Sequence, residues 1–179
     1  MNQEMKVERY GLIAQGFHWL VALLLLGLFV TNSLREMAPE ESQLGWLQLH
    51  MSLGILVFLV TIARIGWRKI VPPPALVDAP KWSQFAANAV HVLLNLATLL
   101  VPVFGYLRVA SKGFAADFFG MQIPSITGEM HGLHEIMEDF FHGEPMEIAL
   151  YVLIGVHVVA ALWHQYVLKD NALRRMLPW

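Results

Sequence analysis

Five histidines lie inside apolar stretches of the sequence, where an ionisable side chain is costly and therefore marks a candidate functional site. His18, His50 and His91 each fall in a separate apolar run, and His157 and His164 share the last one. These last two are seven residues apart, so they fall on nearly the same face of a helix. A neutral imidazole is a common metal ligand and also a proton carrier. The pattern indicates metal, redox or proton chemistry at more than one depth of a membrane.

The apolar runs around these histidines predict membrane-spanning helices. The chain is 56% hydrophobic and 15% charged, and its mean hydropathy is +0.52, which is typical of an integral membrane protein. We expect an all-α bundle of four transmembrane helices, at about 12–34, 44–67, 85–107 and 145–168, because a span needs about 20 apolar residues. The first run is longer than that of a signal peptide and lacks a small-residue cleavage site. We expect one domain over residues 1–179, in contact with membrane lipid and not with nucleic acid.

The cysteine count limits the chemistry further. The sequence has no cysteine, which excludes disulfides, iron–sulfur clusters held by thiolates and covalent haem attachment through C-x-x-C-H. A redox cofactor would therefore be held by histidine, by methionine or by packing alone.

The basic residues predict the orientation of the bundle. Of the 12 lysines and arginines, nine fall on one side of the four-span topology and three on the other. The nine are Lys6, Arg9, Arg64, Arg68, Lys69, Lys81, Lys169, Arg174 and Arg175, and the three are Arg35, Arg108 and Lys112. Because positive residues accumulate on the cytoplasmic side, we expect both termini in the cytoplasm.

With this topology the histidines sort into two levels. The inner level holds His18, His91 and His164, the outer level holds His50 and His142, and His157 lies deeper in the fourth span. A helix from residue 142 to 157 would rise about 22 Å, enough for two stacked sites. An axial pair requires histidines of different helices that face each other across the bundle. A single histidine could instead hydrogen-bond a neighbouring helix, and His91 and His164 could be interfacial or line a quinone pocket.

The outer segment before the fourth span carries a polar stripe at helical spacing. Its members are His131, His134, Glu135, Glu138, Asp139 and His142. We expect an amphipathic periplasmic helix on the outer membrane surface with a solvated acidic face. The alternative is a divalent-metal site at His131, His134 and Glu138.

Three segments together resemble the bacterial cytochrome b-561 family, which includes superoxide oxidase: GFHWLVALLLL, LHMSLGILVFLVTIARIGWR and GVHVVAALWHQYVLKDNALRRMLPW. The resemblance implies a four-helix bundle with two non-covalent haem b groups, each held by two histidines. It implies His18 and His157 at the inner haem and His50 at the outer one. The family places the fourth ligand at the position of Gly143, so His142 is the nearest candidate if one residue is inserted there, with His134 as the fallback. His91 and His164 match family histidines, and the latter resembles one near a proposed quinone site.

The resemblance implies electron transfer in the bacterial inner membrane, between a periplasmic partner and ubiquinone, as in a superoxide:ubiquinone oxidoreductase. Bis-imidazole iron has no open position, which favours electron transfer over oxygen binding. Arg64 and Arg68 either bind the inner propionates or mark the cytoplasmic boundary, and Arg108 and Lys112 are the outer candidates.

One feature departs from a superoxide oxidase. The expected outer segments carry ten acidic residues against three basic ones, which would repel superoxide unless a local basic funnel overrides them. The acidic surface would also suit a basic electron-carrier protein. Two alternatives remain, a membrane-anchor cytochrome subunit of a larger dehydrogenase and a haem-free, histidine-lined metal or proton transporter.

Overall fold

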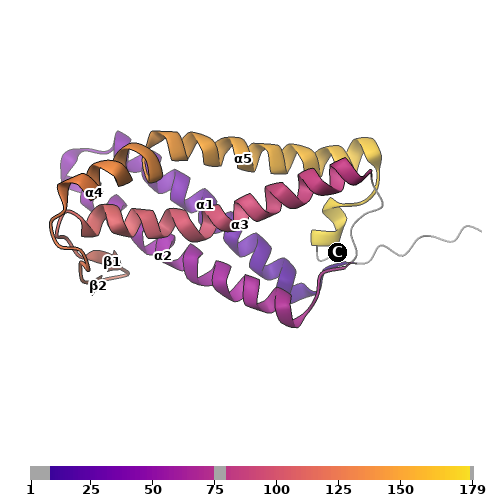
Figure 1. Cartoon of the computed structure of the whole chain (residues 1–179), viewed down its shortest axis with the longest axis horizontal. Helices are drawn as coiled ribbons and strands as arrows, with labels where there is room; N and C mark the ends of the chain where they lie inside the picture. The colour runs from indigo at the N-terminus through magenta and orange to yellow at the C-terminus, as the bar shows by residue number, and fades with distance from the viewer. Residues whose placement is uncertain (1–8, 75–79, 178–179) are drawn as a thin grey trace, which may run out of the picture.

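The computed structural model describes residues 9–74 and 80–177, which form a bundle of long helices (Figure 1). The elements are α1 (Leu12–Met37), α2 (Glu40–Ile70), α3 (Lys81–Ala110), β1 (Ala116–Phe118), β2 (Met121–Ile123), α4 (His131–Ile136), the π-helical η1 (Met137–Phe141), α5 (Glu144–Trp163), the π-helical η2 (His164–Leu168) and the 3-10 turn η3 (Leu173–Met176). The β1–β2 hairpin and α4 lie at one end, here called the hairpin end, and η3 lies at the other, the terminal end (Figure 1).

The prediction of four spans is confirmed. Within residues 9–74 and 80–177, four helical segments are long and apolar enough to cross a membrane: Leu12–Met37, Glu40–Ile70, Lys81–Ala110 and His131–Leu168. The helices exceed the expected spans because charged residues extend them beyond the apolar core. Glu40 and Glu41 occupy the first turn of α2, and Arg68 and Lys69 its last turn, so both sets complement the helix dipole. Lys6, one of the nine residues behind the expected orientation, lies outside the described residues.

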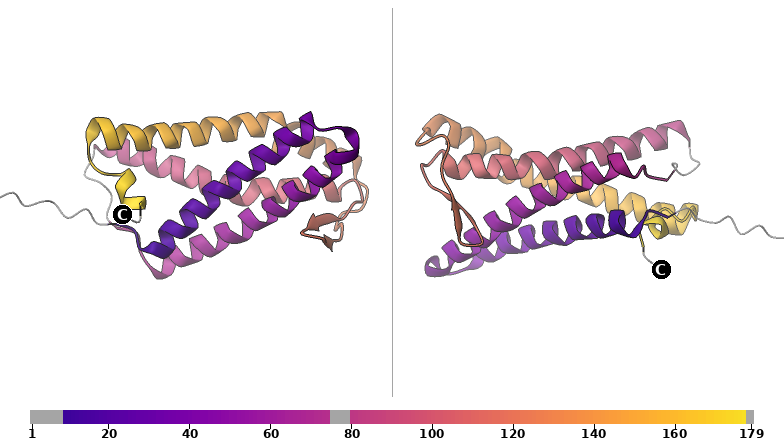
Figure 2. Two further views of the ribbon diagram at one scale, coloured as in Figure 1. Left: turned by 180° about the vertical axis from the view of Figure 1, so that it is seen from behind. Right: turned by 90° about the horizontal axis from the view of Figure 1, so that it is seen from below.

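Small and polar side chains form the contacts between the helices. Val57 and Thr61 of α2 have no exposed surface, and Ser52 is 1% exposed. Helices pack closely through such residues in membranes, where burial of apolar surface gives no preference for helix contact over lipid. The α1–α2 pairing is the most extensive; α2 in turn contacts α3, and α3 contacts α5. The α1–α2 pair runs at an angle to α5 (Figure 2). We call the two parts of the bundle the α1–α2 side and the α5 side.

The amphipathic segment before the fourth span is helical, but not as one regular α-helix. It consists of the six residues of α4 and the five of η1, and it packs against α3. The backbone leaves the helix at His142, with φ −148° and ψ 44°. The sequence periodicity assumed 3.6 residues per turn throughout, whereas a π turn holds one residue more. The π turn and the break after it therefore release His142 from the register of the polar stripe.

The C-terminal segment folds back over the start of α1. Trp19 Nε1 donates to Met176 O at 2.8 Å, and Tyr10 N donates to Arg175 O at 3.0 Å. The Gln15 side-chain amide donates to Tyr10 O at 2.7 Å. The Trp19 indole therefore helps to hold the C-terminal segment against α1.

Candidate functional site

Two pairs of imidazoles face each other across the bundle, one pair toward each end. At the hairpin end, His50 of α2 and His142 have ring centroids 6.2 Å apart and ring planes at 74°. At the terminal end, His18 of α1 and His157 of α5 have centroids 6.2 Å apart and planes at 63°. Each pair therefore joins a histidine from the α1–α2 side to one from the α5 side.

The spacing within each pair matches two imidazoles on opposite sides of one metal ion. A bond from a metal to an imidazole nitrogen is about 2 Å long, so two in line place the ring centroids about 6 Å apart. The rings of His91 and His157 are only 5.3 Å apart. His91 thus lies beside the pair at the terminal end, while His18 has the spacing of an axial partner. His91 was expected at the inner level, but its contact with His157 was not predicted from the sequence.

Hydrogen bonds orient the two rings at the hairpin end. His50 Nδ1 lies 3.1 Å from Leu28 O and 3.2 Å from Thr31 Oγ1, both on α1. His142 Nδ1 lies 3.0 Å from Val101 O on α3. Since a carbonyl only accepts, each Nδ1 carries the proton and donates it, which leaves Nε2 free as a metal ligand.

A glycine makes room for the His142 ring. A Cβ atom on Gly105 would lie 2.6 Å from His142 Cε1 and 2.9 Å from its Nε2. Gly105 is four residues beyond Val101 on the same helix, so it lies over the carbonyl that His142 binds. Gly143, which follows His142 in the chain, also has no room for a side chain, because an added Cβ would fall on the carbonyl oxygen of Glu138.

His134, the alternative to His142, lies against Arg108 and Glu138. Its Nδ1 lies 3.0 Å from Arg108 O and its Nε2 lies 2.8 Å from Glu138 Oε2. Arg108 completes this cluster, since it donates to Glu138 Oε1 at 2.5 Å and to His142 O at 2.9 Å. The geometry therefore favours His142 as the partner of His50. His134 and Arg108 instead stabilise the segment that carries His142.

The stripe itself does not assemble as a metal site. Across residues 9–74 and 80–177, no group of three or more His, Cys, Asp or Glu side chains could hold a metal ion. His134 and Glu138 are in contact, but His131 is exposed and does not join them. Lys112 is also exposed, in the loop that follows α3.

The terminal end gathers two arginines and a histidine–carboxylate pair. Arg64 and Arg68 line a small cavity with Tyr10, Trp67 and Met176. His164 Nδ1 forms a short ion pair with Asp170 Oδ2. Sequence reasoning missed Asp170, because a carboxylate six residues beyond a histidine is not at helical spacing. Lys169 and Asn171, with φ of 55° and 62°, turn the chain back so that the two side chains meet.

Spanning helices with facing imidazoles are the arrangement in which helix bundles house metal cofactors. The fold and these pairs define a class, the membrane proteins whose bundle interior accepts a metal cofactor held by histidines.

Comparison with known proteins identifies the family. The model of prokaryotic cytochrome b561 matches residues 9–179. The chain is 31% identical over 174 residues to a probable superoxide oxidase, CybB, of Yersinia pestis, covering 96% of this chain and 97% of the relative. It is 32% identical over 178 residues to cytochrome b561 homolog 2 of Escherichia coli, covering 95% and 92%. The chain belongs to the prokaryotic cytochrome b561 family.

Membership confirms the resemblance seen in the sequence and the expected location. The protein is a multi-pass protein of the bacterial inner membrane that binds haem b and transfers electrons. The haem-free transporter is therefore set aside.

The contact between Gly105 and His142 yields a first prediction. Gly105→Ala should displace the His142 ring and lower the haem b content of the purified protein, by up to half if only one site is lost. Gly45→Ala is the matched control, since it also lies in a helix near the hairpin end and a Cβ there meets no atom within 4 Å. Pyridine haemochrome measurement of both variants decides, and equal haem in the two would contradict the role of Gly105.

Proposed function

We propose that the protein carries electrons across the membrane between a one-electron partner at the hairpin end and ubiquinone at the terminal end. Two haem b groups would serve as carriers, one held by His18 and His157 and the other by His50 and His142. The observation that supports this most directly is the common ring spacing of 6.2 Å in both pairs.

The side chains around each pair have distinct tasks in this proposal. When bound, haem b supplies a reversible one-electron carrier, and two imidazole ligands leave its iron closed to oxygen. The carbonyls that accept from Nδ1 of His50 and His142 fix the rings and make them stronger donors.

The propionates of the two haems need cationic partners. Arg64 and Arg68 are half-buried, and neither has a carboxylate at ion-pairing distance among the described residues. We assign them to the propionates at the terminal end. At the other end we assign Lys112 and the remaining N–H groups of Arg108.

The quinone reaction belongs at the terminal end, which we propose faces the cytoplasm. The excess of lysine and arginine there supports this orientation. Reduction of ubiquinone to ubiquinol takes up two electrons and two protons, so its site needs groups that pass protons. The His164–Asp170 pair is such a group, and His91 lies beside His157 at the same end. We propose these residues as the lining of the quinone site.

Two partners are candidates at the hairpin end. The Yersinia relative is named a probable superoxide oxidase, and superoxide is a one-electron donor, so two would reduce one quinone. The second candidate is a basic electron-carrier protein, and the charges favour it. Arg108 is paired with Glu138, and Arg35 lies 3.8 Å from Glu36. Since the acidic residues engage these two arginines, the basic funnel that would attract superoxide is weakened.

The haem assignment has a direct test. The detergent-purified protein should give a b-type reduced-minus-oxidised spectrum and two haems per chain, as assigned above. His157→Ala and His142→Ala should each remove one haem and leave the other. His134→Ala should keep both, because the His134 ring lies against Arg108 and Glu138 and its Nδ1 bonds Arg108 O. If His134→Ala loses a haem while His142→Ala retains both, the ligand assignment is wrong.

The quinone assignment is tested at Asp170. Asp170→Asn removes the charge that pairs with His164, so ubiquinone reduction should slow by at least about tenfold, a modest share of what general acid–base catalysis contributes. Haem content and haem reduction from the hairpin end should be unchanged. Glu41→Gln, an exposed acid in the first turn of α2 at that opposite end, is the control. A rate of quinone reduction in Asp170→Asn equal to that of the wild type would show that the His164–Asp170 pair does not pass protons to the quinone.

The two candidate partners respond to charge with opposite sign. Glu135 and Asp139 are exposed at the hairpin end. Neutralising both, as Glu135→Gln with Asp139→Asn, should slow haem reduction by a basic carrier such as a small cytochrome c and accelerate reduction by superoxide. Raising the salt concentration should act in the same directions, because it screens both the attraction and the repulsion. Rates that respond to neither change would show that the acidic surface does not face the incoming partner.

A further inference from the structure

The turn of the β1–β2 hairpin exposes apolar side chains, whereas Asp117, the acid that precedes it, is only 7% exposed. From Phe118 to Ile126 the sequence FFGMQIPSI has no charged residue. Phe119 is 59% exposed and Met121 is 62% exposed. Gln122, the next residue along β2, is also exposed, and its side-chain amide donates to Asp117 Oδ2 at 2.8 Å. An exposed apolar patch with no charge is typical of a surface that meets a membrane or a partner.

The hairpin tip adopts a costly conformation to present its ring. The chain reverses at Phe119 and Gly120, and Phe119 has a φ of 50°, in the left-handed region that bulky residues rarely adopt. Hairpins of this kind ordinarily place Asn, Asp or Gly there. Strained positions of this type persist where the surrounding structure holds them and the strained residue serves a function. An exposed phenylalanine gains nothing from such a position in water.

The surrounding structure does hold the tip, against α2. Phe119 N donates to Ser52 Oγ at 2.9 Å, and Ser52 in turn donates to Gln48 O of its own helix at 2.8 Å. On the other side, Tyr106 of α3 donates to Pro124 O at 2.8 Å. The hairpin is therefore fixed to two membrane-spanning helices, and its position relative to the bundle is set by them.

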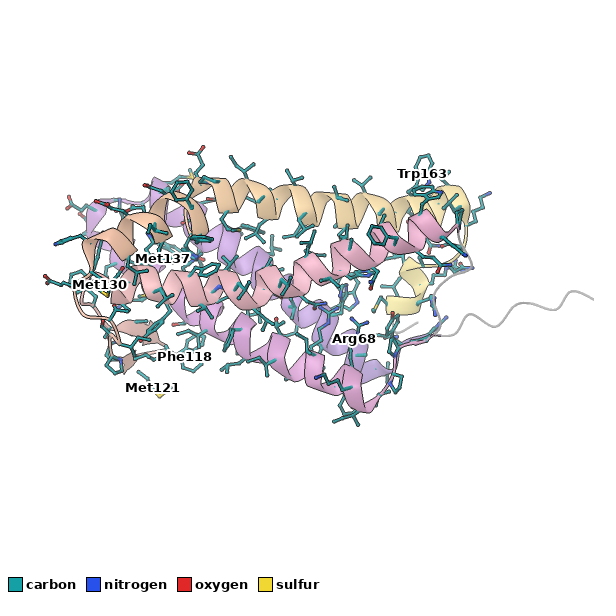
Figure 3. All side chains as sticks on the ribbon, in the orientation of Figure 1. Arg68, Phe118, Met121, Met130, Met137 and Trp163 are labelled. Carbon is teal, nitrogen blue, oxygen red and sulfur yellow. The ribbon has the colours of Figure 1, made fainter. Side chains whose placement is uncertain are left out.

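The fixed position lies at membrane depth. Ser52 is eight residues beyond Leu44, where the apolar stretch of α2 begins, which corresponds to about 12 Å of helix. Met121 projects sideways, away from the helices and across the long axis of the bundle (Figure 3). On α2, Leu59 lies seven residues beyond Ser52, on nearly the same side of the helix, and is 48% exposed.

We propose that the β1–β2 hairpin is an interfacial anchor whose tip, Phe119 to Met121, inserts into the lipid leaflet at the hairpin end of the bundle. The partner is the acyl region of the bilayer, because the tip is uncharged and is bonded to Ser52, within the apolar stretch of α2. The strand pairing and the bond from Gln122 to the buried Asp117 satisfy polar groups of this non-helical segment, as irregular backbone at membrane depth requires. The anchor would hold the His50-bearing end of α2 at a constant depth.

Site-directed spin labelling tests the proposal, and the chain suits it because it has no cysteine. The full-length protein with Met121→Cys carries one nitroxide and is reconstituted in vesicles of phosphatidylethanolamine and phosphatidylglycerol. The collision rate of the label with oxygen, which partitions into lipid, is compared with its collision rate with the water-soluble nickel complex NiEDDA. Leu59→Cys on the flank of α2 is the lipid reference, and Glu41→Cys in the exposed first turn of α2 is the water reference.

A lipid contact predicts an oxygen-to-nickel ratio several-fold above that of Glu41→Cys and close to that of Leu59→Cys. A ratio equal to the water reference would overturn the proposal. Low accessibility to both reagents would overturn it as well, since it would show a protein surface over the tip, and dipolar broadening between labels would identify that surface as a second copy.

A second variant separates the inserted ring from the fold of the hairpin. Asn accepts a positive φ but does not enter lipid, so Phe119→Asn should retain the hairpin. In the Met121→Cys background it should lower the oxygen-to-nickel ratio toward the water reference while the haem spectrum stays unchanged. An unchanged ratio would overturn the assignment of Phe119 as an inserted side chain.

Discussion

The arrangement of the bundle depends on holding imidazoles at ligand distance across an apolar interior. An unpaired imidazole N–H is costly there, so each ring at the hairpin end donates its Nδ1 proton to a backbone carbonyl of a neighbouring helix. His50 thereby joins α2 to α1 at Leu28, and His142 joins the start of α5 to α3 at Val101. The bonds that orient the rings also fix the contacts between helices. A change that displaces a ring, such as a side chain at position 105, therefore affects packing and cofactor binding together.

The four helices and three of the four candidate ligands could be predicted from sequence because both signals are one-dimensional. A run of about 20 apolar residues predicts a span wherever it occurs, and an ionisable residue inside it is conspicuous without any knowledge of its neighbours. The choice between His142 and His134 could not be made in this way. It depends on the π turn before His142, on the absence of a side chain at Gly105 and on the contacts of His134 with Arg108 and Glu138, none of which follows from spacing.

The features that sequence reasoning missed share a physical cause, since each arises from irregular backbone. Asp170 meets His164 because the two residues that flank it have positive φ values, and Phe119 reaches Ser52 because a strained turn presents its N–H. Apolar periodicity carries no information about such turns. The bond from the Trp19 indole to Met176 could not be predicted either, because its acceptor lies 157 positions along the chain.

The two ends of the bundle differ in a way that matches the chemistry proposed for each. Quinone reduction takes up protons, and the terminal end has the histidine–carboxylate pair and the arginines that such a site requires. The reaction at the hairpin end moves an electron alone, and there the titratable groups, His134, Glu138 and Arg108, bond to one another. The exposed carboxylates there, Glu135 and Asp139 among them, give the surface that a partner meets its net acidity. Electrostatic complementarity mainly governs encounter rate and specificity, so the acidity of the hairpin end would select the donor, and the groups at the terminal end would set how its electron is used.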